Sequence, residues 1–196
     1  MEDMTSFDVV AFLFLLGWFI LGYVQGTARR VFGIIALVFS LLVAAQLRQP
    51  LGDYLAGEWT NAPPGYSLMV AFGALFLAFW IALSLGIQWA YHPAPVFQKY
   101  PVIDELLGAL LGVLEGGILL VVVLLVTDPF FTSTAAVSVS PGEFPVFRAL
   151  HDFLNDSLTA AYLRDNVIAN VLAVVGFLFP RDVVETFRAA ASLRFA

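Results

Sequence analysis

Four long apolar runs, separated by short polar connections, dominate the N-terminal part of the chain. They cover residues 7–24, 31–47, 66–91 and 106–126. A helix needs about 20 apolar residues to cross the roughly 30 Å hydrocarbon core of a bilayer. The pattern therefore predicts an all-α membrane protein in which residues 1–126 form a four-helix transmembrane bundle.

The remaining residues, 127–196, predict an extracytoplasmic or interfacial helical tail. Between residues 144 and 162 the apolar positions recur three and four apart, which is typical of an amphipathic helix. We expect this helix to lie on the membrane surface or against the bundle. Its apolar face comprises Phe147, Leu150, Leu154 and Leu158.

A fifth crossing within residues 158–179 is the alternative for the tail. The apolar run at 167–179 is too short to span alone. Extending it back to residue 158 would bury Arg164 and Asp165. Each mid-helix charge costs about 2.5–3.5 kcal/mol, so we predict four crossings.

The connections set the expected topology. We interpret residues 25–30 as a short connection that closes a tight antiparallel hairpin, and residues 48–65 as a loop. Arg29, Arg30 and Lys99 lie in the first and third connections, whereas only Arg48 lies close to a span on the opposite side. Basic residues favour the cytoplasm, so both termini are expected outside it. Three arginines near the C-terminus favour the five-span alternative: Arg181, Arg188 and Arg194.

The amino-acid composition argues against most other classes of protein. The chain is 61% hydrophobic and 12% charged, against about 45–50% and 25% in soluble domains, and no separate soluble domain fits. Nine scattered Lys and Arg residues and a net charge of −6 argue against a nucleic-acid surface. The chain lacks cysteine, and His92 and His151 lie in different segments without a metal-binding motif. We therefore expect no catalytic residue, cofactor or metal site.

Glycines mark the expected helix contacts. Gly108, Gly112 and Gly116 are four residues apart and share one face of the fourth run, while Gly22 and Gly26 repeat this spacing at the end of the first. Small residues allow close approach between membrane helices, so these five are the predicted packing residues.

Three motifs together resemble the colicin V production protein family of small bacterial inner-membrane proteins. Asp8 opens the first run, and a G-x-x-x-G leads from it to the basic pair at 29 and 30. Residues 104–116, of the form D-x-L-L-G-A-L-L-G-V-L-x-G, open the fourth. The resemblance covers about residues 5–160. It implies four spans, a short extracytoplasmic tail and roles in colicin export, in envelope and bile-stress resistance, or in anchoring an extracytoplasmic protease. It implies no enzymatic activity.

Several charges differ from the family's usual pattern. Gln25 replaces an arginine, and Glu105 replaces the basic residue that normally follows Asp104. The family also places an acid at the position of Arg30 and a base at that of Glu115. Because exchanged signs preserve the attraction, we predict an intramembrane Arg30–Glu115 pair. A neutral Glu115, hydrogen-bonded to a neighbouring helix, is the alternative.

These features favour an interaction or assembly protein over an enzyme. Its expected partners are the lipid bilayer and other membrane helices. It would act in envelope or secretion processes, either free-standing or as an accessory subunit of a larger membrane complex. The alternative is a subunit of an oligomeric transporter or channel, in which Glu115 side chains would line a central axis.

Overall fold

The computed structural model describes residues 5–63, 65–90, 101–131, 144–155 and 157–168, and residues 170, 177, 179, 181, 184 and 185. These residues form helices and no strands, which confirms the all-α fold. The elements are α1 (Ser6–Glu58), α2 (Tyr66–Ala90), α3 (Pro101–Phe131), α4 (Pro145–Asn155), α5 (Leu158–Tyr162) and the π-helical turn η2 (Leu163–Ile168).

Helix α1 consists of two arms that meet at Gly26. Gly26 has φ 74° and ψ 175°, a backbone conformation that side-chain-bearing residues rarely adopt. A Cβ at this position would also come within 2.5 Å of the Asp104 carboxylate. Both observations require glycine here. The predicted connection at 25–30 is therefore a single-residue bend.

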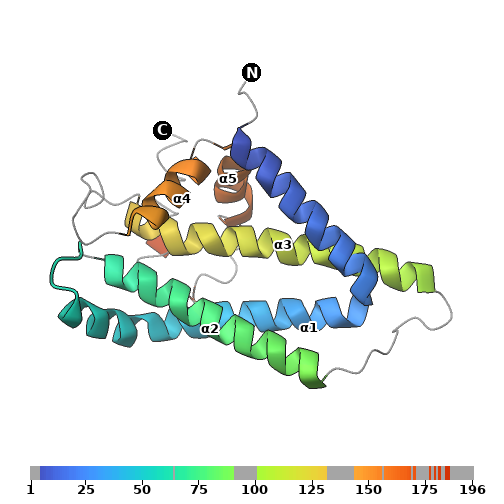
Figure 1. Cartoon of the computed structure of the whole chain (residues 1–196), viewed down its shortest axis with the longest axis horizontal. Coiled ribbons are helices and arrows are strands. Elements are labelled where there is room, and N and C mark those ends of the chain that lie inside the picture. The colour runs from blue at the N-terminus through green and yellow to red at the C-terminus, as the bar shows by residue number, and fades with distance from the viewer. Residues whose placement is uncertain are drawn as a thin grey trace.

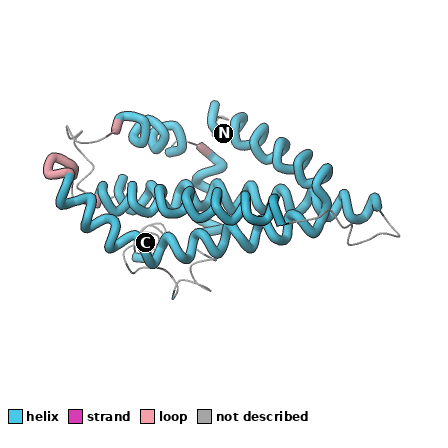
Figure 2. The backbone as a smooth tube through the Cα atoms, turned by 60° about the horizontal axis from the view of Figure 1, so that its bottom comes forward, coloured by secondary structure: helices cyan, strands magenta, loops and turns pink. Residues whose placement is uncertain are grey.

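The two arms diverge from this bend like the sides of a V, as Figures 1 and 2 show. The expected antiparallel hairpin was wrong in this respect. The reason is α3, which packs against both the first arm (residues 6–25) and the second arm (residues 27–58) near the bend. A helix that contacts both arms holds them apart.

Three helices are long and apolar enough to cross a membrane: α1, α2 and α3. Helix α1 has 53 residues and carries the first two predicted runs on its two arms. The sequence patterns thus fall on three helices rather than four, because the chain turns at Gly26 without an intervening loop. Helix α3 begins five residues before the predicted 106–126 run and ends five residues after it.

The second arm continues to Glu58, so the predicted loop at 48–65 is wrong over its first part. Pro50 lies inside this helix although it lacks an N–H donor. Tertiary contacts on both sides of Pro50 hold the segment. Arg48 is buried with its guanidinium 5.7 Å from the Phe72 ring centre, and Gly52 packs against Leu68 of α2.

The apolar core lies among the second arm, α2 and the C-terminal half of α3. Its most buried members include Leu37, Ala44, Phe72, Leu124 and Leu125, all at most 1% exposed. In Figure 1, α2 crosses in front of the second arm, and α3 runs above them, between them and the short helices α4 and α5. This packing places α3 at the centre of the molecule.

The predicted amphipathic helix at 144–162 is two short helices rather than one. Helix α4 ends at Asn155, and the Ser157 hydroxyl accepts a 3.0 Å hydrogen bond from the Ala160 N–H, which caps α5. Leu154 is buried and Phe147 packs against a cluster that contains Tyr66. Asp152 is exposed, as the amphipathic pattern predicts.

Other parts of the tail prediction are untested. Leu150 and Leu158 are 37% and 38% exposed, so their contact with the membrane stays a prediction. Asp156 and most residues after Ile168 lie outside the described residues. The fifth crossing therefore also lies largely outside them.

Candidate functional site

The first arm and α3 cross through their glycines. A Cβ on Gly108 would lie 2.5 Å from the Gly22 carbonyl oxygen and 2.7 Å from the Gly26 carbonyl carbon. On Gly112 it would collide with the backbone of Trp18. On Gly116 it would meet the Trp18 ring at 3.0 Å. The structure thus brings all five predicted glycines to one helix crossing.

Arg30 and Glu115 lie next to this crossing and contact each other. Nη1 of Arg30 donates to Oε2 of Glu115 at 2.5 Å, and the two residues are 3% and 4% exposed. Gly33 makes room for the carboxylate, since a Cβ there would lie 2.7 Å from its Oε1. The guanidinium also lies 4.9 Å from the Trp18 ring centre. The pair ties the second arm to α3.

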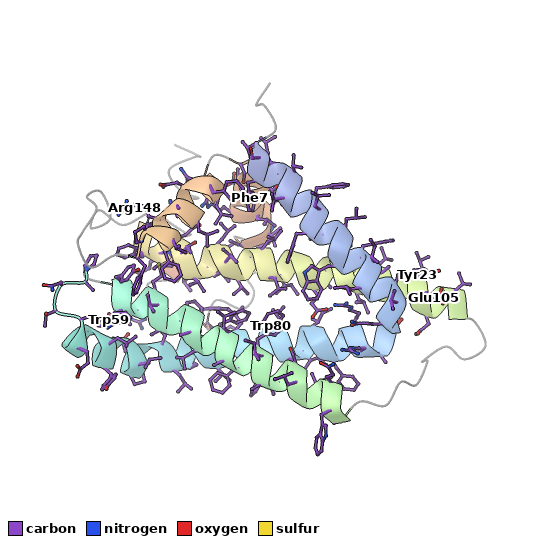
Figure 3. All side chains as sticks on the ribbon, viewed as in Figure 1. Phe7, Tyr23, Trp59, Trp80, Glu105 and Arg148 are labelled. Carbon is purple, nitrogen blue, oxygen red and sulfur yellow. The ribbon has the colours of Figure 1, made fainter. Side chains whose placement is uncertain are left out.

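The packing at the Gly26 bend brings Arg30 and Glu115 to the same level of the bundle. Gly26 packs beside Asp104 and Gly108, so Arg30, one turn later, reaches the level of Glu115. The Thr27 hydroxyl fixes this register with a 2.9 Å hydrogen bond to the Asp104 carbonyl oxygen. Nearby, Tyr23 and Glu105 lie beside each other on the first arm and α3 (Figure 3).

A second buried charge cluster lies at the other end of α3. Arg164 of η2 donates from Nε and Nη2 to the two carboxylate oxygens of Asp128, at 2.8 and 3.0 Å. The Asp128 side chain is 2% exposed, and His151 Nε2 lies 4.0 Å from it. Bidentate arginine–carboxylate pairs are strong and directional. This pair fastens the tail to the bundle.

Sequence reasoning missed this cluster. It ended the fourth apolar run at residue 126, before Asp128, whereas α3 continues through Pro129 to Phe131. Arg164 was considered only because burying its charge would make a fifth crossing unfavourable. The available signal was an acid just after an apolar run and a base in the tail that could pair with it.

Asp8 makes the other bond between bundle and tail. Its carboxylate accepts hydrogen bonds from the Thr159 N–H at 2.8 Å and the Thr159 hydroxyl at 2.7 Å. It also accepts from the N–H and hydroxyl of Thr5, both at 2.9 Å, which forms a capping box. The sequence indicated a helix-start role for Asp8 but not its contact with α5.

The surroundings of His151 favour its neutral form. Burial lowers its pKa below the ordinary value of 6.5, and the Arg164 cation acts in the same direction. The carboxylates of Asp128 and Asp152 oppose this shift. Within the described ranges, no three His, Cys, Asp or Glu side chains are grouped so that they could hold a metal ion. His92 lies outside those ranges.

The two charge clusters are separated by an apolar layer of α3. Residues 117–126 carry no polar side chain, and Val121, Val122, Leu124 and Leu125 are at most 6% exposed. From residue 116 to residue 127 the helix rises about 16 Å at 1.5 Å per residue. The described part of one chain therefore shows no continuous polar path along α3.

The family model for colicin V production protein matches residues 7–167. The chain belongs to the colicin V production protein family. The match includes the glycine crossing and both charge clusters, so the resemblance inferred from the sequence is confirmed. No curated protein and no solved structure matches the chain. It is a helical, strongly apolar membrane protein of the colicin V production family.

Proposed function

We propose that the protein acts through contacts with other membrane helices, as a non-enzymatic assembly factor or accessory subunit in envelope or secretion processes. Its place would be the bacterial inner membrane, with both termini outside the cytoplasm. Family membership supports a role in this setting. The observation that carries the proposal is an apolar groove beside α3.

The groove has a volume of about 490 Å³ and lies between the second arm and α3, with η2 at one side. Its lining is apolar throughout, from Val38 and Leu41 on the arm to Val113 and Val121 on α3. Gly117 lies in this lining, and a Cβ added there would meet nothing within 4 Å. A gap beside a glycine is a place where a partner helix approaches closely.

The buried charged groups of the protein support the same proposal. Asp8, Asp128 and Arg164 are used to hold the tail on the bundle, and Arg30 with Glu115 joins α1 to α3. Each of these charges thus has a structural task. The apolar layer between the clusters argues against conduction through a single chain. The transporter alternative requires an oligomer whose axis is built from several copies.

The test is purification from native membranes in mild detergent. The proposal predicts stoichiometric co-migration with another membrane protein on a native gel. Gly117→Leu fills the groove and should abolish co-migration while leaving the protein folded. Gly86→Leu is the matched control, because Gly86 also has open space around it but lies on α2 outside the groove.

Two results would contradict the proposal. One is a protein that migrates alone, or a complex that survives Gly117→Leu. The other is ion or proton flux through proteoliposomes that contain only the purified protein and that Glu115→Gln abolishes. The second result would favour the transporter or channel alternative.

A further inference from the structure

A polar pocket of about 200 Å³ opens beside the Arg30–Glu115 pair. It lies between the first arm, the second arm and α2, next to the Gly26 bend. Such a pocket is unusual in a bundle this apolar, because polar surface facing hydrocarbon is costly. Its polar lining comprises Gln25, Arg29, Arg30, Ser84, Gln88 and Glu115.

Two buried donors belong to residues of this lining and lack partners among the described residues. Nε of Arg30 makes no hydrogen bond among the described residues, and the residue is only 3% exposed. Nε1 of Trp80, the α2 tryptophan labelled in Figure 3, is likewise buried and without an acceptor. Leaving a buried donor unsatisfied costs about 1–3 kcal/mol. An oxygen acceptor would satisfy both donors.

The charge of the lining specifies that acceptor further. Arg30 is already balanced by Glu115, so Arg29 leaves the pocket with an excess positive charge. The amides of Gln25 and Gln88 and the hydroxyl of Ser84 can donate additional hydrogen bonds. Arginine and amide donors around a small space are suited to a phosphate-type oxyanion.

Size and position agree with this chemistry. At about 30 Å³ for each water, the pocket holds roughly six waters, or one small oxyanion with part of its hydration shell. Gln88 lies in the last turn of α2, and Gln25 and Arg29 flank the bend of α1. Helix α1 reverses and α2 ends beside these residues, as helices do at the level of lipid headgroups, whereas Glu115 extends the lining towards the middle of α3.

We propose that this pocket binds a phosphate-type oxyanion, supplied either by the headgroup of an anionic phospholipid or by soluble phosphate. The ligand oxygens accept hydrogen bonds from Arg30 Nε and Trp80 Nε1, and Arg29 neutralises its charge. The Arg30–Glu115 pair remains intact beside it. Binding of the anion at this site would therefore stabilise the observed arrangement of the two arms of α1.

The test uses the full-length protein in a lipid-free mild detergent and measures binding in separate arms. Native mass spectrometry would follow titration with phosphatidylglycerol and, in parallel, with phosphatidylcholine. Calorimetry would follow titration with inorganic phosphate. We expect one phosphatidylglycerol per chain, retained more strongly than phosphatidylcholine, or saturable phosphate binding at one site. Phosphate that binds and displaces the lipid identifies a soluble oxyanion, whereas lipid binding that phosphate leaves unchanged identifies the headgroup.

Two variants address the pocket without breaking the ion pair. Trp80→Phe removes the Nε1 donor and keeps a six-membered aromatic ring that can stack on Phe76, and Arg29→Gln removes the excess charge. Each should weaken binding about tenfold, the effect of one lost hydrogen bond to a charged group. Arg148→Gln removes a charge on α4, far from the pocket, and should leave binding unchanged (Figure 3). Binding that is equal for both lipids and absent for phosphate, or that neither pocket variant changes, would overturn the proposal.

Discussion

Arg30 and Glu115 form a buried ion pair that joins the second arm of α1 to the middle of α3. Both residues are less than 5% exposed, and Trp18 and Gly33 enclose them. A buried pair of this kind contributes little net stability relative to a well-packed apolar pair. Removing one partner leaves an uncompensated charge, however, so the pair fixes which residues of α1 and α3 lie opposite each other.

Reversing one charge of this pair should destabilise the bundle strongly. Glu115→Arg places two guanidinium groups in one buried site, and breaking a buried pair costs about 3–5 kcal/mol. Adding Arg30→Glu restores the attraction with exchanged signs and should recover much of the loss. Thermal unfolding in detergent measures both steps. A double variant no more stable than Glu115→Arg alone would show that the attraction does not hold these helices together.

The glycine crossing should be intolerant of side chains. Gly112→Leu puts a branched side chain against the backbone of Trp18 and should prevent α1 and α3 from approaching. Gly117→Leu is the matched control on the same helix, because its side chain would enter open space. We expect a large fall in Tm, or loss of the folded protein, only for Gly112→Leu. Equal stability of the two variants would contradict the observed crossing.

The Asp128–Arg164 pair should hold the tail on the bundle. Asp128→Asn removes the charge that two arginine nitrogens contact, at a cost of about 3–5 kcal/mol for an unpaired buried charge. Limited proteolysis should then cut between α4 and η2 faster than in the unaltered protein. Asp152→Asn removes an exposed charge from the same cluster and should leave the cleavage rate almost unchanged.

Acid should loosen the same contact through His151. Its pKa is lower in the folded state than its ordinary value of 6.5, so the unfolded chain binds a proton more readily. This contribution to stability is therefore fully present above about pH 6.5 and is lost as the pH falls towards the lower, folded-state pKa. The charged groups facing His151 are Asp128, Asp152 and Arg164.

The measurement is the difference in Tm between the protein and His151→Phe, which keeps a ring to stack on Phe131. Between pH 7.5 and pH 5.5 the unaltered protein should lose more stability than the variant. Parallel curves would show that protonation of His151 has no influence on the tail contact.

The sequence predicted the all-α membrane fold and the residues of the central crossing, because apolar run length and glycine spacing are local signals. It also proposed that Arg30 and Glu115 meet, from the exchanged signs. It did not predict the one-residue bend at Gly26 or the V of the two arms, since these depend on α3 packing against both. The contacts of Asp8 with Thr159 and of Asp128 with Arg164 were missed because no local pattern indicates which polar residues of the bundle and the tail meet.

The central claim is that the groove beside Gly117 receives a helix of another membrane protein. The chain has no cysteine, so a cysteine introduced at 117 or at 86 is the one position of this chain that a thiol-reactive, photoactivatable benzophenone can label in native membranes. Illumination should yield one discrete cross-linked membrane protein from position 117 and none from position 86. Cross-linking of lipid alone from position 117, or the same products from both positions, would contradict the claim.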